Sequence, residues 1–314
     1  MGSLSPIAQT QIFVLAFRGL THSPPSPPNL GNRNFLPPKL GGWGAKQQYL
    51  RKSGLISPLW RTMTRKGYQR YCQKVSARTQ SAPIPLTGDF LMGLKAVILD
   101  IDGTLVLSND AHAQAWVEAF AAYGYDVPFE KVRPLIGMGG DQVVPKMVPG
   151  LNDEEGDGKA IAQKRKELII NRLGPKLSPT KGSRELLLRM QDAGLRLLIA
   201  TSATSEELSV LLKAAQVDDL LDKDEATTSS DAEASKPAPD IVEAALSKLK
   251  LEPSEVLMLA DTPYDIKSAQ GAGVGMIAVR CGGFDDEELA GAIAIYDDPA
   301  DLLAHYADSP LGQD

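Results

Sequence analysis

The sequence predicts an α/β protein with a doubly wound parallel sheet, an inserted helical domain, and a basic, largely disordered N-terminal extension. After Met92, short apolar runs alternate with amphipathic stretches, which is the pattern of a parallel sheet covered by helices on both faces. The first two apolar runs lie about 95 residues apart, far more than one crossover helix needs, so an independent unit is inserted between them. Before Met92, no apolar period is long enough to build a core.

The extension, residues 1–91, differs from the rest of the chain in charge and in proline content. It holds 12 lysines and arginines against one acid, a net charge of +11, whereas residues 92–314 carry 21 basic and 38 acidic residues. It also contains 10 of the 22 prolines. Such a leader is typical of an organellar transit peptide, and it also fits upstream sequence that is translated because the start codon is placed too early. Met92, just before the first strand, favours the second interpretation and a cytoplasmic protein; a genuine transit peptide would make it organellar.

Composition excludes several classes of protein. The 43% hydrophobic and 23% charged residues are those of an ordinary globular protein. The apolar stretch at residues 12–17 is too short to span a membrane, so no membrane partner is expected. The two cysteines, Cys72 and Cys281, indicate neither a disulfide framework nor a metal site. Basic and aromatic residues are interspersed in the extension, but without a nucleic-acid-binding fold we do not expect nucleic acid as a partner.

The core domain is expected at residues 92–108 and 176–314. Apolar runs predict strands at 95–100, 196–201, 225–229, 256–260, 275–280 and 293–296. Amphipathic spacing predicts helices at 183–193, 205–215, 239–249, 263–272 and 299–306. Because strands and helices alternate, neighbouring strands should run parallel.

The inserted domain is expected at residues 109–175 and is helical. Asn109 or Asp110 is predicted to cap a helix that carries Ala113, Trp116 and Phe120 on one face. Apolar residues recur at helical spacing farther along, at Ile161, Leu168, Ile169 and Leu173.

The most informative segment is Asp100-Ile101-Asp102-Gly103-Thr104, which follows the first predicted strand. Ligands bind at the carboxyl ends of the strands in open α/β sheets. Strand geometry alone would bury one of the two carboxylates at a large desolvation cost, unless the chain leaves the strand at Asp102 and a cation compensates the charge. Gly103 permits that departure.

Polar residues follow two further strands. The second strand runs into Thr201 and the fourth into Asp261, and parallel neighbours bring such ends to one edge of the sheet. Asp265 follows Asp261 by four residues, so both are expected on one face of a helix's first turn. Lys236 lies in a loop that can reach the same edge. The two aspartates and the lysine also have structural explanations, because acidic residues favour helix N-termini and a loop lysine is usually solvated.

As a set, these residues resemble the haloacid dehalogenase-like hydrolase superfamily. The resemblance runs from Met92 to the C-terminus through DIDGTL at 100–105, the hydroxyl at Thr201, KPAPD at 236–240 and ADTPYD at 260–265. It implies a Rossmann-like core with a helical cap, and an enzyme that hydrolyses phosphoric monoesters. Asp102 indicates phosphate chemistry, because members that displace halide lack this second aspartate.

The resemblance also implies roles for the catalytic residues. Asp100 would be the nucleophile that forms an aspartyl-phosphate, and Asp102 the acid/base that protonates the leaving oxygen and then activates water. Thr201 and Lys236 would hold the transferring phosphoryl group.

The implied cofactor is Mg²⁺. It would be bound by the Asp100 carboxylate, the backbone carbonyl of Asp102 and the Asp261 carboxylate. Asp265 would support the metal shell or orient Lys236. A divalent ion and a lysine are needed because a carboxylate and an anionic phosphate repel each other.

The helical insertion resembles the branch of the superfamily that contains phosphoglycolate phosphatases and β-phosphoglucomutases, whose cap closes over the site. Its predicted specificity loop is residues 136–141. His112 matches a position where the mutases also carry histidine, although a lone helical histidine is more often structural. The residues expected to contact the substrate are Gly103, Thr104, Ser202, His112, Gly139 and Gly140.

The expected partner is a small-molecule phosphate ester, such as phosphoglycolate or a sugar phosphate, and the enzyme is expected to be a monomer or dimer. A β-phosphoglucomutase-like phosphotransferase is the main alternative. Gly140 stands where those mutases place an arginine for the second phosphate, which favours a hydrolase. Leu107 and Ala260 stand where members commonly carry Asp and Gly, and they leave the substrate and the cap geometry open.

Three other classes of protein share some of these features. A receiver-like signalling domain also uses aspartates, a hydroxyl and a lysine on a doubly wound sheet, but the long insertion and the Asp-x-Asp arrangement argue against it. The glycines at 271–275 follow a helix and precede a strand, the reverse of a dinucleotide-binding order. A scaffold protein that has lost turnover would not need every catalytic residue, and all are present.

Overall fold

The computed structural model of the chain describes residues 93–312. The predictions for the extension at residues 1–91, for Met92 and for Cys72 lie outside the described residues. Within residues 93–312, no helix combines the length and the apolar character needed to cross a membrane.

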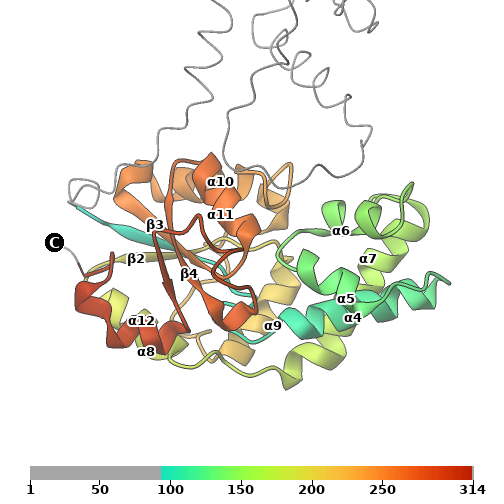
Figure 1. The fold of residues 1–314 in the computed structure, drawn as a ribbon, viewed down its shortest axis with the longest axis horizontal. Coiled ribbons are helices and arrows are strands. Elements are labelled where there is room, and N and C mark those ends of the chain that lie inside the picture. Colours follow the sequence, from blue (N-terminus) through green and yellow to red (C-terminus); the bar gives the residue numbers. More distant parts are fainter. Residues whose placement is uncertain (1–92, 313–314) are drawn as a thin grey trace, which may run out of the picture. The chain divides into compact units, whose positions relative to one another are not determined.

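The core is a sheet of five parallel strands in the order β2-β1-β3-β4-β5 (Figure 1). The strands are β1 (Ala96–Leu99), β2 (Arg196–Ile199), β3 (Val256–Ala260), β4 (Gly275–Val279) and β5 (Ala294–Tyr296). In the register of the sheet, Leu99 pairs with Ile199 on one side and with Leu259 on the other. The residues that follow β1, β2 and β3 therefore emerge next to one another at one edge.

Helices cover both faces of this sheet, which is why its central strands are apolar throughout. The helices of the core are α8 (Ser183–Asp192), α9 (Ser205–Ala215), α10 (Asp240–Leu249), α11 (Pro263–Gly271) and α12 (Pro299–Ala304). Val97 and Leu99 of β1 pack in one cluster with α8, α9 and α12, whereas Ala96 and Ile98 pack in another with α10 and α11. In Figure 1, α10 and α11 accordingly lie on one side of the sheet and α8 and α12 on the other. The predicted α/β fold and its core helices are confirmed, with ends that differ by two residues or fewer.

The strand predicted at 225–229 is wrong, because this segment forms a single bridge between Thr227 and Ala200. The Thr227 N–H donates to the Ile199 carbonyl at 2.8 Å, and its carbonyl accepts from the Thr201 N–H at 3.0 Å. Thr228 then begins a helical turn at Ser229–Asp231 as its capping residue. The chain therefore turns away before a ladder can extend.

The insertion between β1 and β2 is helical and buries its own apolar cluster. Its helices are α4 (Asn109–Ala122), α5 (Phe129–Val132), α6 (Gly140–Met147) and α7 (Gly156–Leu168). A short 3₁₀ turn at Arg133–Leu135 follows α5, and a π-turn at Ile169–Leu173 and a 3₁₀ turn at Gly174–Lys176 follow α7. The predicted face of α4, with Ala113, Trp116 and Phe120, is buried in this cluster together with Ile161 of α7. The insertion therefore packs around a core of its own.

The predicted cap of α4 is wrong. Ser108, not Asn109 or Asp110, precedes the helix, and its side chain makes no capping hydrogen bond. Asn109 is the first helical residue, and its side chain is directed to the site described below.

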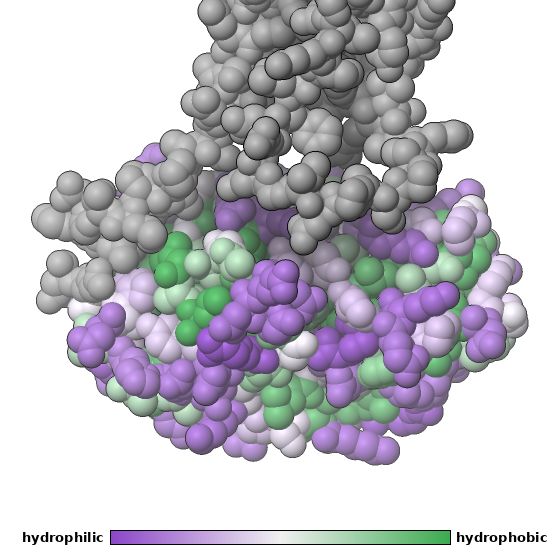
Figure 2. Space-filling model, in the orientation of Figure 1, coloured by the Kyte–Doolittle hydropathy of each residue, from purple (hydrophilic) through white to green (hydrophobic). Residues whose placement is uncertain are grey.

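The exposed large hydrophobic side chains in the described part of the chain come from three different segments: Leu107, Tyr123 and Leu188. Figure 2 shows hydrophilic side chains interspersed with smaller hydrophobic areas on the face in view. The core and the insertion thus bury their own apolar faces.

Candidate active site

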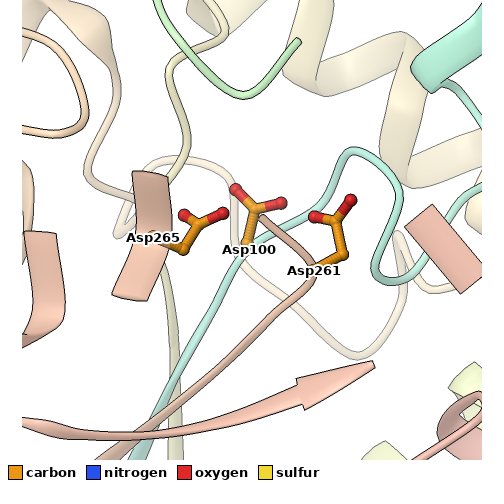
Figure 3. A group of neighbouring side chains, drawn as sticks. All are labelled: Asp100, Asp261 and Asp265. Carbon is orange, nitrogen blue, oxygen red and sulfur yellow. The ribbon is translucent and has the colours of Figure 1, made fainter. Parts of the chain in front are cut away.

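Three acidic residues meet at the edge where β1 and β3 end. Asp100 follows β1 directly, and Asp261 follows β3. The Asp100 N–H donates to the Leu259 carbonyl at 3.0 Å, which fixes the two strand ends in register. Asp265 reaches the same place from the first turn of α11, and carboxylate oxygens of the three residues lie within 4.8 Å of one another. In Figure 3 the three carboxyl groups stand in a row and point the same way.

The predicted placement of Asp261 and Asp265 on one helix face needs a correction. Thr262 caps α11 and receives the Asp265 N–H at 3.1 Å, so Asp261 lies before the helix, on the strand end. The two carboxylates nevertheless converge, because β3 and α11 meet at this capping turn.

Lys236 is held by these acids at the end of a loop. Its Nζ lies 2.6 Å from Asp100 Oδ1 and 2.6 Å from Asp265 Oδ1, and it donates to the Ala200 carbonyl at 3.2 Å. The side chain is 1% exposed. Burial alone would lower the pKa of Lys236, but Asp100 and Asp265 outweigh it and hold that pKa above its usual value. The ammonium is therefore charged in its buried position.

One ammonium does not balance three buried carboxylates. Burial raises the pKa of Asp100 to about 7 despite the attraction of Lys236. Burial also raises the pKa of Asp261 well above its usual range, and the neighbouring Asp100 and Asp265 add to the rise. Without further positive charge, the cluster must take up protons.

The residues present fit a divalent cation. The donors are carboxylate oxygens, which hard cations such as Mg²⁺ prefer, and an added cation would offset the excess negative charge. Asp265 Oδ1 pairs with Lys236 while its Oδ2 accepts from the Thr262 hydroxyl, so this residue already orients the lysine. Asp100 and Asp261 are thus the carboxylates best placed to hold a metal.

Gly103 and Thr104 pack around the acids. Gly103 has a φ of +75°, and a Cβ there would lie 2.2 Å from Asp261 Oδ2, so only glycine fits. The Thr104 hydroxyl is completely buried and lies 3.4 Å from Asp100 Oδ2 and 3.2 Å from Asp261 Oδ1. The structure therefore places both residues against carboxylates, whereas from the sequence they were expected to contact the substrate.

Asp102 faces away from the three acids and towards the insertion. It accepts from Ser108 Oγ at 2.5 Å, and its Oδ1 lies 2.6 Å from His112 Nε2. Arg165 Nη2 lies 2.6 Å from the other ring nitrogen, so Nδ1 accepts and Nε2 carries the hydrogen. Burial alone would raise the pKa of Asp102, but His112 and Ser108 outweigh it and bring that pKa below its usual value.

A cavity opens above Asp100 and Asp102 between the core and the insertion. Its lining contains Thr201 and Ser202 from the end of β2, His112 and Trp116 from α4, Arg165 from α7, and loop residues 136–140 and 203. Of the predicted substrate-contacting residues, Ser202, His112, Gly139 and Gly140 line this cavity. Gly103, Thr104, Lys236, Asp261 and Asp265 are not in its lining but pack around Asp100.

The predicted specificity loop, residues 136–141, is hydrogen-bonded to the core beside Lys236. Asp141 accepts a short hydrogen bond from Ser235 Oγ, and the Gly139 N–H donates to the same Oγ at 3.1 Å. Tyr264 of α11 donates its hydroxyl to the Pro134 carbonyl at 2.6 Å. The insertion is therefore closed over the cavity.

Sequence reasoning missed two residues that touch the site. Asn109 donates to Asp261, but its position at a helix start made it look like a cap. Arg165 lies in the run Lys164-Arg165-Lys166, which looks like a solvated helix face; its guanidinium instead pairs with the buried Glu207 of α9 and lies 5.4 Å from the Trp116 ring centroid. No signal in the sequence distinguishes Arg165 from its neighbours.

Comparisons with known proteins agree with this geometry. The family model for haloacid dehalogenase-like hydrolases matches residues 97–279, more than half of the chain. A CbbY protein from Rhodobacter capsulatus is 34% identical over 59% of this chain and 85% of its own length. A phosphoglycolate phosphatase from Rhodospirillum rubrum is 29% identical over 66% of this chain and 89% of its own length.

A solved hydrolase from Pseudomonas syringae has the same fold. It superposes with a TM-score of 0.63 and 29% identity, covering 68% of this chain and 98% of its own. Together with the family match and the residues at the strand ends, this likeness shows that the chain belongs to the haloacid dehalogenase-like hydrolase family and is a phosphoric monoester hydrolase.

Proposed function

We propose that the protein is a Mg²⁺-dependent phosphatase that acts on small phosphorylated metabolites through a phosphoryl group carried on Asp100. The observation that carries the proposal is the arrangement at one strand edge: Asp100 lines the cavity, contacts Lys236 at 2.6 Å, and has Asp261 beside it. These are a nucleophile, a cation for the phosphate and a metal ligand within one cluster.

In the first step, an Asp100 carboxylate oxygen attacks phosphorus, and the bond from phosphorus to the ester oxygen breaks. The leaving oxygen takes a proton from Asp102. In the second step a water molecule attacks the phosphorus of the aspartyl-phosphate and gives a proton to Asp102, the bond to Asp100 breaks, and phosphate is released. The carboxylate and the carboxylic acid are both regenerated.

The surroundings of Asp102 support this double role. Ser108 and His112 stabilise its ionised form, which the second step needs in order to accept a proton. The first step needs the protonated form, and an anionic phosphate bound beside Asp102 raises the pKa of its carboxyl group by like-charge repulsion. His112 is therefore a positioning residue in this proposal.

Lys236 and Thr201 are assigned to the phosphoryl group. Thr201 is 1% exposed and lines the cavity, and its backbone is held between β2 and Thr227. Mg²⁺, held by the carboxylates of Asp100 and Asp261 and by the carbonyl of Asp102, would supply positive charge to offset the repulsion between the nucleophile and the phosphate. Asp265 keeps the lysine oriented.

The cavity favours a hydrolase over a mutase. A Cβ on Gly140 would lie 2.8 Å from an Asp153 carboxylate oxygen, so the part of the loop where a mutase needs a cation for a second phosphate faces an acid. Trp116, Ile136 and Met138 present apolar surface to the rest of the substrate. Phosphoglycolate, the substrate named for one relative, and sugar phosphates are the classes that we propose first.

A phosphate-release screen tests this function. The purified full-length chain is incubated with p-nitrophenyl phosphate and a panel of phosphometabolites, with Mg²⁺ and with EDTA, beside the Asp100→Asn variant. We expect release that needs Mg²⁺ and is absent from the variant. Release by Asp100→Asn at the wild-type rate, or release that is unaffected by EDTA, would contradict the proposal.

A further inference from the structure

The side chain of Asn109 is buried at the start of α4 and forms its hydrogen bonds with the acid cluster and a neighbouring loop, not with its own helix. It is 4% exposed, and its Nδ2 donates to Asp261 Oδ2 at 2.7 Å and to the Gly282 carbonyl at 3.0 Å. Both amide hydrogens therefore have acceptors. A capping role would have directed the side chain to the backbone of the first turn, and α4 has no such bond.

The Asp261 carboxylate is enclosed on both of its oxygens. Thr104 Oγ1 lies 3.2 Å from Oδ1, and Asn109 Nδ2 lies 2.7 Å from Oδ2. The backbone is equally close, since a Cβ on Gly282 would lie 1.7 Å from Oδ2. The carboxylate therefore has one orientation, set by the hydroxyl, the amide and the glycine backbone.

The side-chain donors to Asp261 are neutral, whereas each of its two acidic neighbours also pairs with the charged Lys236. Lys236 pairs with Asp100 and Asp265, but Asp261 accepts from a hydroxyl and an amide. A neutral donor fixes the direction of a carboxylate without cancelling its charge. Partners of this kind orient metal ligands, and their loss weakens metal affinity by about 10- to 100-fold.

Asn109 is itself held through the Gly282 carbonyl. Arg133, from the insertion, donates to the same carbonyl at 2.6 Å and to Asp110 at 2.6 Å. Hydrogen bonds therefore connect Arg133 and Asn109 through the Gly282 carbonyl, and Asn109 to Asp261. Both side-chain donors, Arg133 and Asn109, belong to the insertion.

We propose that Asn109 is a positioning residue that aims the Asp261 carboxylate at the metal, with Arg133 supporting it through the Gly282 carbonyl. This inference rests on the proposed function, in which Asp261 is a metal ligand. Asn109 touches neither the phosphate nor the reacting oxygens in this account, so its effect is exerted on metal binding.

The test compares full-length wild type with two variants. Asn109→Leu keeps the branched shape and the number of heavy atoms but removes the donor, and Asn109→Ser is shorter and cannot reach Asp261. Mg²⁺ dissociation constants are measured by calorimetry without substrate. Melting temperatures are measured in EDTA, and kcat is measured as a function of the Mg²⁺ concentration. Gln114→Ala is the matched control, because the exposed Gln114 lies on the same helix and its amide donates to Glu118, away from the acid cluster.

Both Asn109 variants should bind Mg²⁺ about 10- to 100-fold more weakly, and excess Mg²⁺ should restore most of kcat. Arg133→Met should give a smaller loss, and Gln114→Ala none. Unchanged Mg²⁺ affinity in either folded Asn109 variant overturns the inference, as does a loss of kcat that excess Mg²⁺ does not rescue. If the wild type itself neither binds Mg²⁺ nor releases phosphate, the proposed function fails and the inference fails with it.

Discussion

Replacing Lys236 by methionine removes the positive charge of the buried cluster while nearly keeping the length of the side chain. In the wild type, the Nζ atom lies 2.6 Å from oxygens of both Asp100 and Asp265 and is 1% exposed. The Lys236→Met variant leaves these two carboxylates buried without their partner. We therefore expect a loss of stability that depends on whether the carboxylates are ionised.

The size of the loss follows from the ion pair. Removing one partner of a buried ion pair lowers the free energy of unfolding by about 3–5 kcal/mol when the other group stays charged. A carboxylate can avoid this cost by binding a proton. The pKa of Asp100 is about 7 with the lysine present, against an ordinary value of 3.8, and it rises further when the lysine is lost.

The sign of the pH dependence is set by that rise. A group whose pKa is higher in the folded than in the unfolded protein stabilises the fold most at low pH, and this contribution is lost as the pH rises through the folded pKa. At about pH 5 the variant holds Asp100 neutral, so its loss of stability should be small. At about pH 8 the loss should be clearly larger, and it approaches about 3–5 kcal/mol as the pH rises through the raised pKa of Asp100 in the variant.

Urea unfolding in EDTA at these two pH values measures the difference directly, because EDTA removes any contribution from bound metal. Lys95→Met is the control, since Lys95 forms an exposed pair with Glu255 at 2.6 Å and its loss should cost about 0–1 kcal/mol at both pH values. An equal loss for Lys236→Met at both pH values would refute the reasoning, and so would a loss no larger than that of the control.

Three further predictions concern Asp102, metal binding and the N-terminal extension. His112→Gln removes a group that lowers the pKa of Asp102, so the acid limb of the pH profile of kcat should move to higher pH. An unchanged profile would show that His112 does not tune the pKa of Asp102. Calorimetry should show that Mg²⁺ binds more tightly as the pH rises from about 5 to 7 and that binding releases protons. The reason is that Asp100, with a pKa of about 7, must ionise before it can bind the metal. An affinity that does not change with pH would contradict this expectation. The fragment Met92–Asp314 should keep the kcat/KM of the full chain, and loss of activity on trimming would show that the extension contributes to the enzyme.

The position of the site was predictable because its residues lie where strands end. Asp100, Thr201 and Asp261 each follow an apolar run, and parallel strands bring such ends to one edge, so convergence followed from pattern alone. A loop lysine alone predicts little, and Lys236 was included because the whole set of residues resembles the family; the structure places its Nζ 2.6 Å from Asp100 Oδ1.

Other features depend on the geometry of a turn or on contacts between distant segments, and the apolar pattern does not show them. The run at 225–229 has the composition of a strand, but Thr228 uses its side chain to start a turn and the ladder stops at one bridge. Asn109 looks like a capping residue, and only the approach of Asp261, 152 positions away, shows where its amide goes. Arg165 is one of three consecutive basic residues, and the fold alone selects it for His112.

Identification of a phosphoryl group on Asp100 tests the central claim most directly. The Asp102→Asn variant is mixed with p-nitrophenyl phosphate and Mg²⁺, quenched in acid, digested and analysed by mass spectrometry. Since p-nitrophenolate leaves without a proton, the first step should proceed while the second, which needs Asp102 as a base, is slowed. We expect the phosphoryl group to accumulate on the peptide that contains Asp100. Nitrophenol release with that peptide unmodified, or a phosphoryl group on another residue, would contradict the account.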